Sequence, residues 1–480
     1  MRTICLVLGL VSLLFCACGT GNSGAVIGFI PTGSFSNASL SGQYVYQIEG
    51  FDFSVPNNVV SYREIGVFTA DGNGRITSAT DDFSEGNTVF GTTSTGSYAI
   101  SNDGTGSLSF SNALGTIKLA VTLVSSSKLY LVEGDTLLNA GGLAEKQDAT
   151  AIAAAPSGPF AFREHDVNST QSVAGVGAFT VSGGTVSAGN EDVNRAGVLT
   201  SLTFTGFLNS PNSTTGRGTA TFTDSSLATS SFIYYIVDAN NLRLLSSTSG
   251  VTGSGRAEKQ NGTPALSGSY AFGSKGDTLS FLSDVNTAGR FSASAGSITA
   301  GALDFVQDGV TATNVSFTGA YAQAASGRAL VSLTTTSNSN FVVWMVSPSR
   351  GFFLINDPNT IQDGTLDLQT ASTFSNSTMS GQYALVMDGF DAGGAKDRVG
   401  TLHWDGSGKL TLNEFTNAAG VINVPILISG NYSVSGDGRT TGSLSGLSNN
   451  LVFYLVSGND AYVVQNDAGV EINGTISKQH

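Results

Sequence analysis

Cysteine is almost absent from this sequence. The chain has 480 residues and three cysteines, Cys5, Cys16 and Cys18, all of them near its start. Beyond Cys18 the chain has no thiol, so no internal disulfide can form there. Whatever holds the fold together must therefore be packing, hydrogen bonds and ion pairs.

Charged residues are also few. They make up 12% of the chain, and 21 Lys and Arg stand against 35 Asp and Glu, which gives a formal net charge of −14. The Lys and Arg residues form no cluster. Nucleic-acid binding and electrostatic docking on anionic lipid both need a basic surface, so the sequence predicts neither.

Runs of strong helix formers are missing as well. The sequence instead has 61 Gly, many Ser and Thr, 40% hydrophobic residues and 28 Phe. Disordered chains combine high charge with few aromatic residues, so this chain has the means to bury a core. A composition rich in Gly, Ser, Thr, Val and Phe is typical of an all-β protein.

The first residues are typical of a secretory signal. A short basic start, Met1-Arg-Thr, precedes an apolar run from Ile4 to Ala17 that is too short to span a bilayer comfortably. The run ends in Leu14-Phe-Cys-Ala-Cys-Gly19, and the following Gly-Thr-Gly-Asn-Ser-Gly is typical of a flexible tether.

This end of the leader resembles the lipobox of bacterial lipoproteins, in which a small residue precedes a Cys that is lipidated before cleavage. Ala17 and Cys18 match that pattern, whereas Phe15 and Cys16 depart from it. The resemblance implies that Cys18 carries the lipid and anchors the protein in the cell envelope. Gly19 after the Cys is compatible with the outer membrane. The alternatives are ordinary cleavage nearby or an uncleaved anchor.

One short pattern occurs four times along the chain. An apolar run ends on a marker Val, four turn-type residues follow, and a second apolar run begins at the same offset. Such a pattern predicts a β-hairpin with a four-residue loop. The marker residues are Val124, Val237, Val346 and Val456.

The hairpin belongs to a unit of about 110 residues. Each copy opens with Ser-Gly and an aromatic strand, at positions 41, 157, 267 and 380, and closes on Gln147, Gln260, Gln369 or Gln479. A repeat of this length indicates separate or loosely docked small domains instead of solenoid coils. The boundaries that follow are a signal peptide at 1–17, a tether at 18–39 and β-repeats at 40–148, 157–260, 266–370 and 379–480.

Each copy contains eight candidate strands with short connections. Consecutive strands should then be antiparallel neighbours, and closing the meander would remove both edges. We expect a small eight-stranded up-and-down barrel in each copy, its opening Tyr strand paired with its closing Gln strand. A β-sandwich is the alternative. The unit resembles uncharacterised repeats of secreted bacterial lipoproteins, and its outline is similar to the lipocalin and avidin barrels.

Three sets of acids are candidates for chemistry. The Asp71-Gly-Asn-Gly turn has two of the positions that a calcium loop needs, but tight-turn geometry explains it without a ligand. Asp135, Asp357 and Asp467 recur after the marker Val, with Thr248 in copy two, and are expected to cap turns. A third set lies near the end of strand three, where a solvated strand end competes with a cation or polar-ligand site at a barrel mouth: Asp81, Asp82, Glu191, Asp192, Asp304 and Glu414.

Nothing in the sequence points to a particular catalytic centre. The three histidines, His165, His403 and His480, occupy unlike positions, and no Gly-x-Ser-x-Gly lies on a strand-to-helix turn. Trp344 and Trp404 occupy strand positions and are more typical of a core than of a sugar platform. We expect no catalytic residue, metal or cofactor, although paired glycosidase carboxylates have no local signature.

The sequence therefore favours a lipid-anchored, non-catalytic binding or structural module of the cell envelope. Repetition supports this interpretation because arrays gain avidity by duplication. The expected partners are the membrane, through the anchor, and a surface polymer or protein. A secreted hydrolase acting on a surface polymer and an array of small-ligand-binding barrels are the alternatives.

Overall fold

The computed structural model describes residues 34–480 apart from 56–57, 86–87, 112–114, 169–170, 280–283, 335–339 and 446–449. Cys18 and the rest of the leader lie outside this part. The described residues all belong to one compact unit, Gly33–His480. Within them, no helix is long and apolar enough to cross a membrane.

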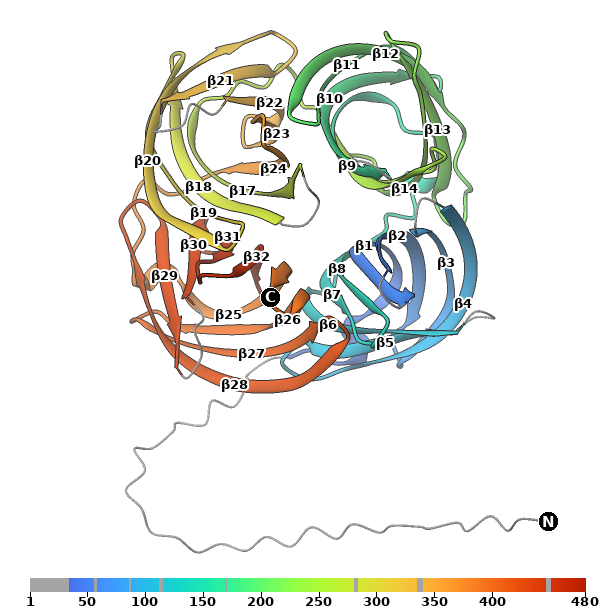
Figure 1. The fold of residues 1–480 in the computed structure, drawn as a ribbon. Helices are drawn as coiled ribbons and strands as arrows, with labels where there is room; N and C mark the ends of the chain where they lie inside the picture. Colours follow the sequence, from blue (N-terminus) through green and yellow to red (C-terminus); the bar gives the residue numbers. More distant parts are fainter. Residues whose placement is uncertain are drawn as a thin grey trace, which may run out of the picture. The chain divides into compact units, whose positions relative to one another are not determined.

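The described residues form 32 strands, which make four closed barrels of eight (Figure 1). Barrel 1 contains β1 (Ser41–Val55), β2 (Asn58–Asp71), β3 (Arg75–Glu85), β4 (Thr88–Ile100), β5 (Thr105–Ser111), β6 (Thr116–Ser125), β7 (Lys128–Glu133) and β8 (Leu138–Lys146). Barrel 2 contains β9 (Gly158–Asn168), β10 (Ser172–Ser182), β11 (Thr185–Arg195), β12 (Val198–Leu208), β13 (Arg217–Asp224), β14 (Thr229–Asp238), β15 (Asn241–Ser246) and β16 (Val251–Lys259).

Barrel 3 contains β17 (Gly268–Thr278), β18 (Asp284–Ser294), β19 (Ser297–Gln307), β20 (Val310–Gln323), β21 (Arg328–Thr334), β22 (Asn340–Ser347), β23 (Arg350–Asn356) and β24 (Thr360–Leu368). Barrel 4 contains β25 (Ser380–Asp391), β26 (Gly394–Asp405), β27 (Lys409–Ala418), β28 (Val421–Val434), β29 (Arg439–Leu444), β30 (Asn450–Leu455), β31 (Asp460–Gln465) and β32 (Val470–Lys478). Three single 3₁₀ turns precede barrels 1, 2 and 4: η1 (Asn37–Ser39), η2 (Ala151–Ala153) and η3 (Asn376–Thr378).

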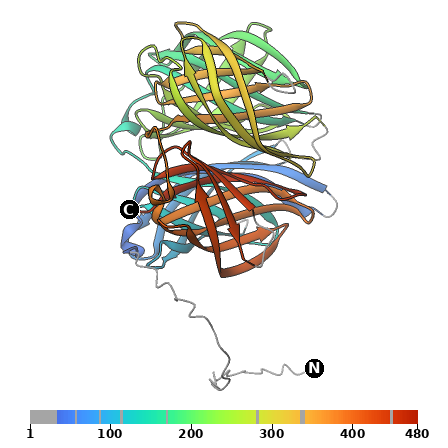
Figure 2. The same ribbon diagram turned by 90° about the vertical axis from the view of Figure 1, so that its left-hand side faces the viewer.

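Every barrel is an antiparallel up-and-down meander closed by its first and last strands, which confirms the expected fold and excludes the sandwich. In barrel 1, Tyr44 of β1 pairs with Lys146 of β8. Figure 2 shows the tilted strands of the barrels from the side. Closure satisfies the backbone groups that an open edge would leave unpaired.

The repeated hairpin is confirmed, with a tighter turn than the sequence indicated. In copies one to three the outer residues of the four pair with each other, as Ser125 does with Lys128, so two residues make the turn. In copy four the strands stop at Leu455 and resume at Asp460. The offset is constant because one turn fixes the register of both strands.

Aromatic side chains inside the barrels lie over glycines of neighbouring strands. A Cβ on Gly66 would stand 2.7 Å from the ring of Tyr46, and one on Gly177 would stand 2.6 Å from that of Phe162. The same arrangement relates Gly289 to Phe272 at 2.4 Å. A bare backbone lets the ring lie flat on the inner wall, which is how a narrow barrel holds so many large side chains.

Neighbouring barrels are fastened to each other by buried ion pairs. Arg217 of barrel 2 donates from Nε and Nη2 to the two oxygens of Asp82 in barrel 1, at 2.7 Å each, and Tyr235 donates a third hydrogen bond at 2.8 Å. The carboxylate is nearly inaccessible, at 4% exposure. We call this group of an Asp, an Arg and an aromatic donor a clasp. Barrels 2 and 3 share a clasp of Asp192, Arg328 and Trp344. Barrels 3 and 4 share one of Asp304, Arg439 and Tyr454.

These clasps correct two expectations. Of the six acids near the end of the third strand, five are buried and Glu191 is half-buried. Adjacent residues alternate between faces, so Asp81 lines barrel 1 while Asp82 faces barrel 2. The barrels are also not loosely docked, because apolar clusters shared by neighbours lie beside the clasps, such as Val45, Ile65 and Val67 against Ile233 and Leu245.

The closing Gln of each copy links its barrel to the next. Gln147 donates from Nε2 to the carbonyl oxygens of Thr215 and Ile236 in barrel 2. Gln260, Gln369 and Gln479 make the equivalent pair of hydrogen bonds, and Gln479 donates to Asp103 and Leu123 of barrel 1. Barrel 4 therefore returns to barrel 1, and the four barrels form a closed ring.

The first strands of the four copies, β1, β9, β17 and β25, face the middle of this ring (Figure 1). Lys275 of β17 forms ion pairs with Asp388 of β25 and with Glu49 of β1, the latter at 3.8 Å. Burial disfavours the ammonium ion, but the charges of Asp388 and Glu49 outweigh it and raise the pKa of Lys275. One lysine thus ties three barrels together.

Barrel 2 joins the same junction through Arg163 and His165. Arg163 pairs with Asp363, and His165 contacts Asp363 at 2.9 Å through Nδ1 and Asp277 at 3.2 Å through Nε2. Burial acts to lower the pKa of His165, but hydrogen bonds to Asp277 and Asp363 raise it to about 10. Asp277 and Asp363 therefore favour the protonated imidazole, beside the cations of Lys275 and Arg163.

Candidate functional site

The first two sets of acids that the sequence singled out accept hydrogen bonds from the backbone. Asp71 Oδ1 accepts the N–H groups of Asn73 and Arg75, at 2.7 and 3.0 Å, which confirms its role as a turn residue. Asp135 and Asp357 cap turns in the same way. In the equivalent places, Thr248 accepts the N–H of Ser231 and Asp467 that of Asn450.

Both tryptophans are buried, as expected. Trp344 is 1% exposed and lies between barrels 2 and 3, where Nε1 donates to Asp192, while Trp404 is fully buried inside barrel 4. Among the described residues, no three His, Cys, Asp or Glu side chains are placed to bind a metal ion together. The predicted lipid site, Cys18, lies outside those residues.

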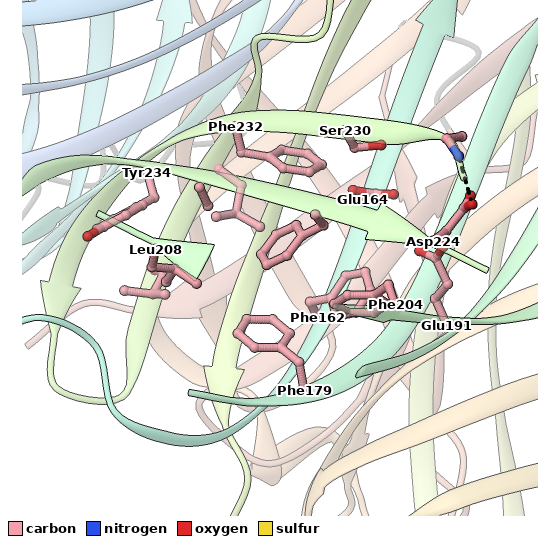
Figure 3. A pocket seen from close by; sticks show the side chains of 15 residues that line it. Phe162, Glu164, Phe179, Glu191, Phe204, Leu208, Asp224, Ser230, Phe232 and Tyr234 are labelled. Carbon is pink, nitrogen blue, oxygen red and sulfur yellow. Dashed lines mark hydrogen bonds between the residues drawn. The ribbon is translucent and has the colours of Figure 1, made fainter. Parts of the chain in front are cut away.

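A cavity of about 40 Å³ lies inside barrel 2 and reaches one end of the barrel (Figure 3). Six aromatic rings and three acids are among the side chains that line it. These are Phe162, Phe179, Phe204, Phe222, Phe232 and Tyr234, with Glu164, Glu191 and Asp224.

Strand register separates the two kinds of lining residue. Along β12 and β13, Phe204 pairs with Asp224 near one end of the barrel, and Leu208 pairs with Ala220 towards the other. The acids are half-buried, whereas Leu208 is 5% exposed and Tyr234 is fully buried. The cavity therefore has an acidic mouth and an apolar closed end.

The rings hold one another in place. Phe204 stands edge-on to Phe162 at 5.9 Å and to Phe222 at 5.3 Å between centroids, and Phe222 also contacts Phe179 at 5.7 Å. A Cβ on Gly189 would lie 2.3 Å from the ring of Phe204. Edge-to-face contacts of this kind favour a rigid wall over a collapsed one.

The three acids differ in their tendency to ionise. Burial, followed by the charges of Asp166 and Glu191, raises the pKa of Glu164 well above its usual range. Burial and the charge of Asp224 raise the pKa of Glu191 to about 7. Burial acts on Asp224 too, but hydrogen bonds from Ser226 and Ala228 lower its pKa overall.

Barrel 1 has a different buried acid at the equivalent level. Ile48 pairs with Glu64 there, whereas Glu164 pairs with Gly175 in barrel 2, so a glycine takes the place of Glu64. Tyr46 and Tyr62 both donate to the carboxyl group of Glu64, whose pKa burial raises to about 7. In barrel 4, Arg398 occupies that position and lies 3.8 Å from Glu414.

Sequence reasoning singled out Glu191 but not Glu164, Asp224 or the aromatic wall. Phe160, Phe162 and Glu164 alternate along β9, so strand periodicity already places Glu164 on the inner face. The pattern does not show how far the side chains of neighbouring strands extend into the space beside Glu164. The alternating pattern around an acid is the same whether the space beside it is empty or is occupied by a tyrosine from another strand.

Comparisons with solved structures find proteins that overlap little with this chain. No protein-family model matches the chain, and no curated protein matches it in sequence. The chain is similar to a mutant of the vaccine antigen transferrin-binding protein B from Haemophilus parasuis, with 11% identity over 75% of this chain and 85% of that one, at a TM-score of 0.19. It is similar to intact Ap-TbpB, with both lobes, at 9% identity over 91% and 95% of the two chains and a TM-score of 0.19. CghA matches at 8% identity over 91% and 88%, with a TM-score of 0.14. Overlaps of this size assign no function to the chain.

Proposed function

We propose that this chain is a lipid-anchored, non-catalytic binding protein of the cell envelope, and that barrel 2 holds a small, mostly apolar ligand. The aromatic cavity with a few polar groups at one end carries the proposal. Small-molecule sites in proteins are concave and mostly apolar, with a small number of polar groups that orient the ligand. The anchor rests on Cys18 and the leader before it.

The cavity favours a small ligand over a polymeric substrate. A glycosidase places two carboxyl groups on either side of a bond in a bound sugar, so its site must admit the polymer. The acids of barrel 2 instead surround the end of a narrow interior space whose far wall is closed by Tyr234 and Leu208. A ligand would enter by one end and remain there unchanged.

The test uses the chain without its first 18 residues and n-hexanol as a neutral apolar probe. A ligand that binds only the folded state raises the melting temperature, and the rise increases with the logarithm of its concentration relative to Kd. The control is Ala220→Leu, which should fill the cavity with three more carbon atoms. Barrel 1 carries Leu108 at the equivalent position, counted from the first residue of its fifth strand, so the fold accepts this side chain.

Hexanol should raise the melting temperature of the wild type and leave that of folded Ala220→Leu unchanged. Chemical-shift changes should concentrate on the Phe and Tyr rings of barrel 2. Equal stabilisation of both proteins would show that the probe acts elsewhere and would contradict the proposal. Turnover of a surface polymer by the wild type would replace it with the hydrolase alternative.

A further inference from the structure

We infer that the ligand of barrel 2 is an amphiphilic organic cation, whose ammonium group lies among Glu164, Glu191 and Asp224 and whose slim apolar tail lies between the rings. This inference rests on the proposed function, since it names the ligand class for the same cavity. It concerns the charge and shape of the ligand, neither of which the apolar wall alone determines.

The charge at the mouth is one-sided. Three carboxyl groups line the cavity, and no lysine, arginine or histidine is among the lining side chains. The cation that acts on them is Arg195 at the end of β11, which is exposed and lowers the pKa of Glu191 and Asp224 by its charge. One exposed guanidinium does not balance the three carboxyl groups, so the remaining negative charge would repel an anionic ligand.

One of the acids is held in its ionised form by the fold. Asp224 Oδ1 accepts hydrogen bonds from the N–H and Oγ of Ser226, at 2.7 Å each, and from the N–H of Ala228 at 3.0 Å. Three donors on one carboxylate oxygen stabilise the charged state. The mouth therefore keeps at least one fixed negative charge beside the cavity.

In the other two acids, Glu164 and Glu191, nearby negative charge destabilises the ionised form. The charge of Asp224 and the burial of Glu191 both disfavour ionisation of Glu191, and the charge of Glu191 does the same to Glu164. A bound cation would relieve this repulsion and favour ionisation of both groups. Binding of a cation and deprotonation at the mouth should thus reinforce each other.

The aromatic rings next to the acids suit a cation and its tail. The faces of aromatic rings attract cations, most strongly when the cation is desolvated, and Phe162, Phe204 and Phe232 line the cavity. The volume of the cavity limits the shape of the tail. An engineered cavity of about 150 Å³ binds benzene. This one measures about 40 Å³, which suits part of an unbranched alkyl chain better than a ring.

The rim carries an apolar side chain as well. Leu227, in the turn between β13 and β14, is 84% exposed and has a φ of 70°, a left-handed conformation that is unfavourable for leucine. Its neighbours Asp224 and Ala228 line the cavity. A hydrophobic group next to the acids offers the emerging part of an alkyl ligand a contact outside the barrel.

The test compares three probes of equal length, n-hexylammonium, n-hexanol and n-hexanoate, by calorimetric titration at pH 8 and low salt. Hexylammonium should bind at least about tenfold more tightly than hexanol, a difference of about 1.4 kcal/mol, and hexanoate should bind least. Glu191→Gln should weaken hexylammonium about tenfold and leave hexanol unchanged. Asp308→Asn, which removes an exposed charge from barrel 3, is the matched control for net charge.

The outcomes separate the two proposals. If hexanol and hexylammonium bind equally well and Ala220→Leu blocks both, the cavity is a ligand site but the inference of a cation is wrong. If none of the probes binds, the proposed function fails with it. If hexylammonium binding survives both Glu191→Gln and Ala220→Leu, the cation is held at another surface, which also overturns the inference.

Discussion

The backbone N–H of His480 donates a hydrogen bond of 3.1 Å to the carbonyl oxygen of Val124, and so joins the last residue of the chain to the first barrel. Asp148, Asn261 and Thr370 make the same contact with Val237, Val346 and Val456, at 2.8 to 2.9 Å. The marker Val of each copy is therefore an acceptor for the copy before it. The fourth contact joins copy four to copy one and so completes the ring.

A circular permutant should fold to the same ring. Phe35 and Gln479 lie together, since a Cβ on Gly104 would stand 3.0 Å from the ring of one and 2.6 Å from Nε2 of the other. Joining His480 to Ser34 by a short glycine linker, and opening the chain between Asp148 and Pro156, should preserve cooperative melting and the β circular-dichroism spectrum. A permutant that does not fold would show that the seam between barrels 4 and 1 is weaker than its contacts indicate.

Asp192→Asn should destabilise the protein strongly. The carboxylate is inaccessible and accepts two hydrogen bonds from Arg328 and one from Trp344, and an amide nitrogen in its place would oppose those donors. Losing one partner of a buried pair costs about 3 kcal/mol, which the urea midpoint would reveal. Asp71→Asn is the control and should change it little, because Asn caps turns as well. Similar effects in both variants would mean that the clasp contributes nothing beyond a surface ion pair.

Stability should fall as the pH rises from about 6.5 to about 10, through His165. The pKa of this imidazole is higher in the folded protein than in the unfolded chain, so its contribution is complete below pH 6.5 and is lost as the pH approaches 10. His165→Gln should therefore melt well below the wild type at pH 6 and closer to it at pH 10. In the control His403→Gln, where burial lowers the pKa, the difference should stay constant above pH 7. A constant difference for His165→Gln would contradict an ion pair with Asp277 and Asp363.

Cys18 is predicted to be the lipidated first residue of the mature protein, on the basis of Ala17-Cys18 at the end of the leader. Metabolic labelling with an acyl-chain analogue should mark the wild type and leave Cys18→Ser unmarked. The wild type should also partition into the membrane fraction. Equal labelling of the two proteins, or a wild type recovered wholly in the soluble fraction, would rule out the anchor.

The fold of each copy could be read from local patterns. Strand alternation, turn residues at fixed offsets and a repeat of about 110 residues together predict an eight-stranded meander, and closure follows because an open sheet leaves two unpaired edges. The turn roles of Asp71 and Asp135 were predictable for the same reason, since an Asx turn involves only residues close in sequence. These features depend on short-range geometry.

The cavity of barrel 2 depended on more distant contacts. Its lining comes from strands far apart in the sequence, such as Glu164 of β9 and Asp224 of β13, and no single strand reveals which side chains its neighbours place opposite it. Sequence periodicity gives the face on which Glu164 lies. It does not give the empty volume in front of that face, because this volume depends on how much space the side chains of the seven other strands fill.

By itself, the sequence determined four similar antiparallel β units and the two faces of their strands, and it favoured a barrel over a sandwich. Only the tertiary structure decided what the outer faces meet: Asp82 and Asp192 lie on the outer face, where the pattern predicts water, and instead bind Arg217 and Arg328 of the next barrel. The physical reason is that a carboxylate is satisfied equally by water or by a buried guanidinium. Its place in the sequence is the same in both cases, and the docked barrels alone determine which partner it has.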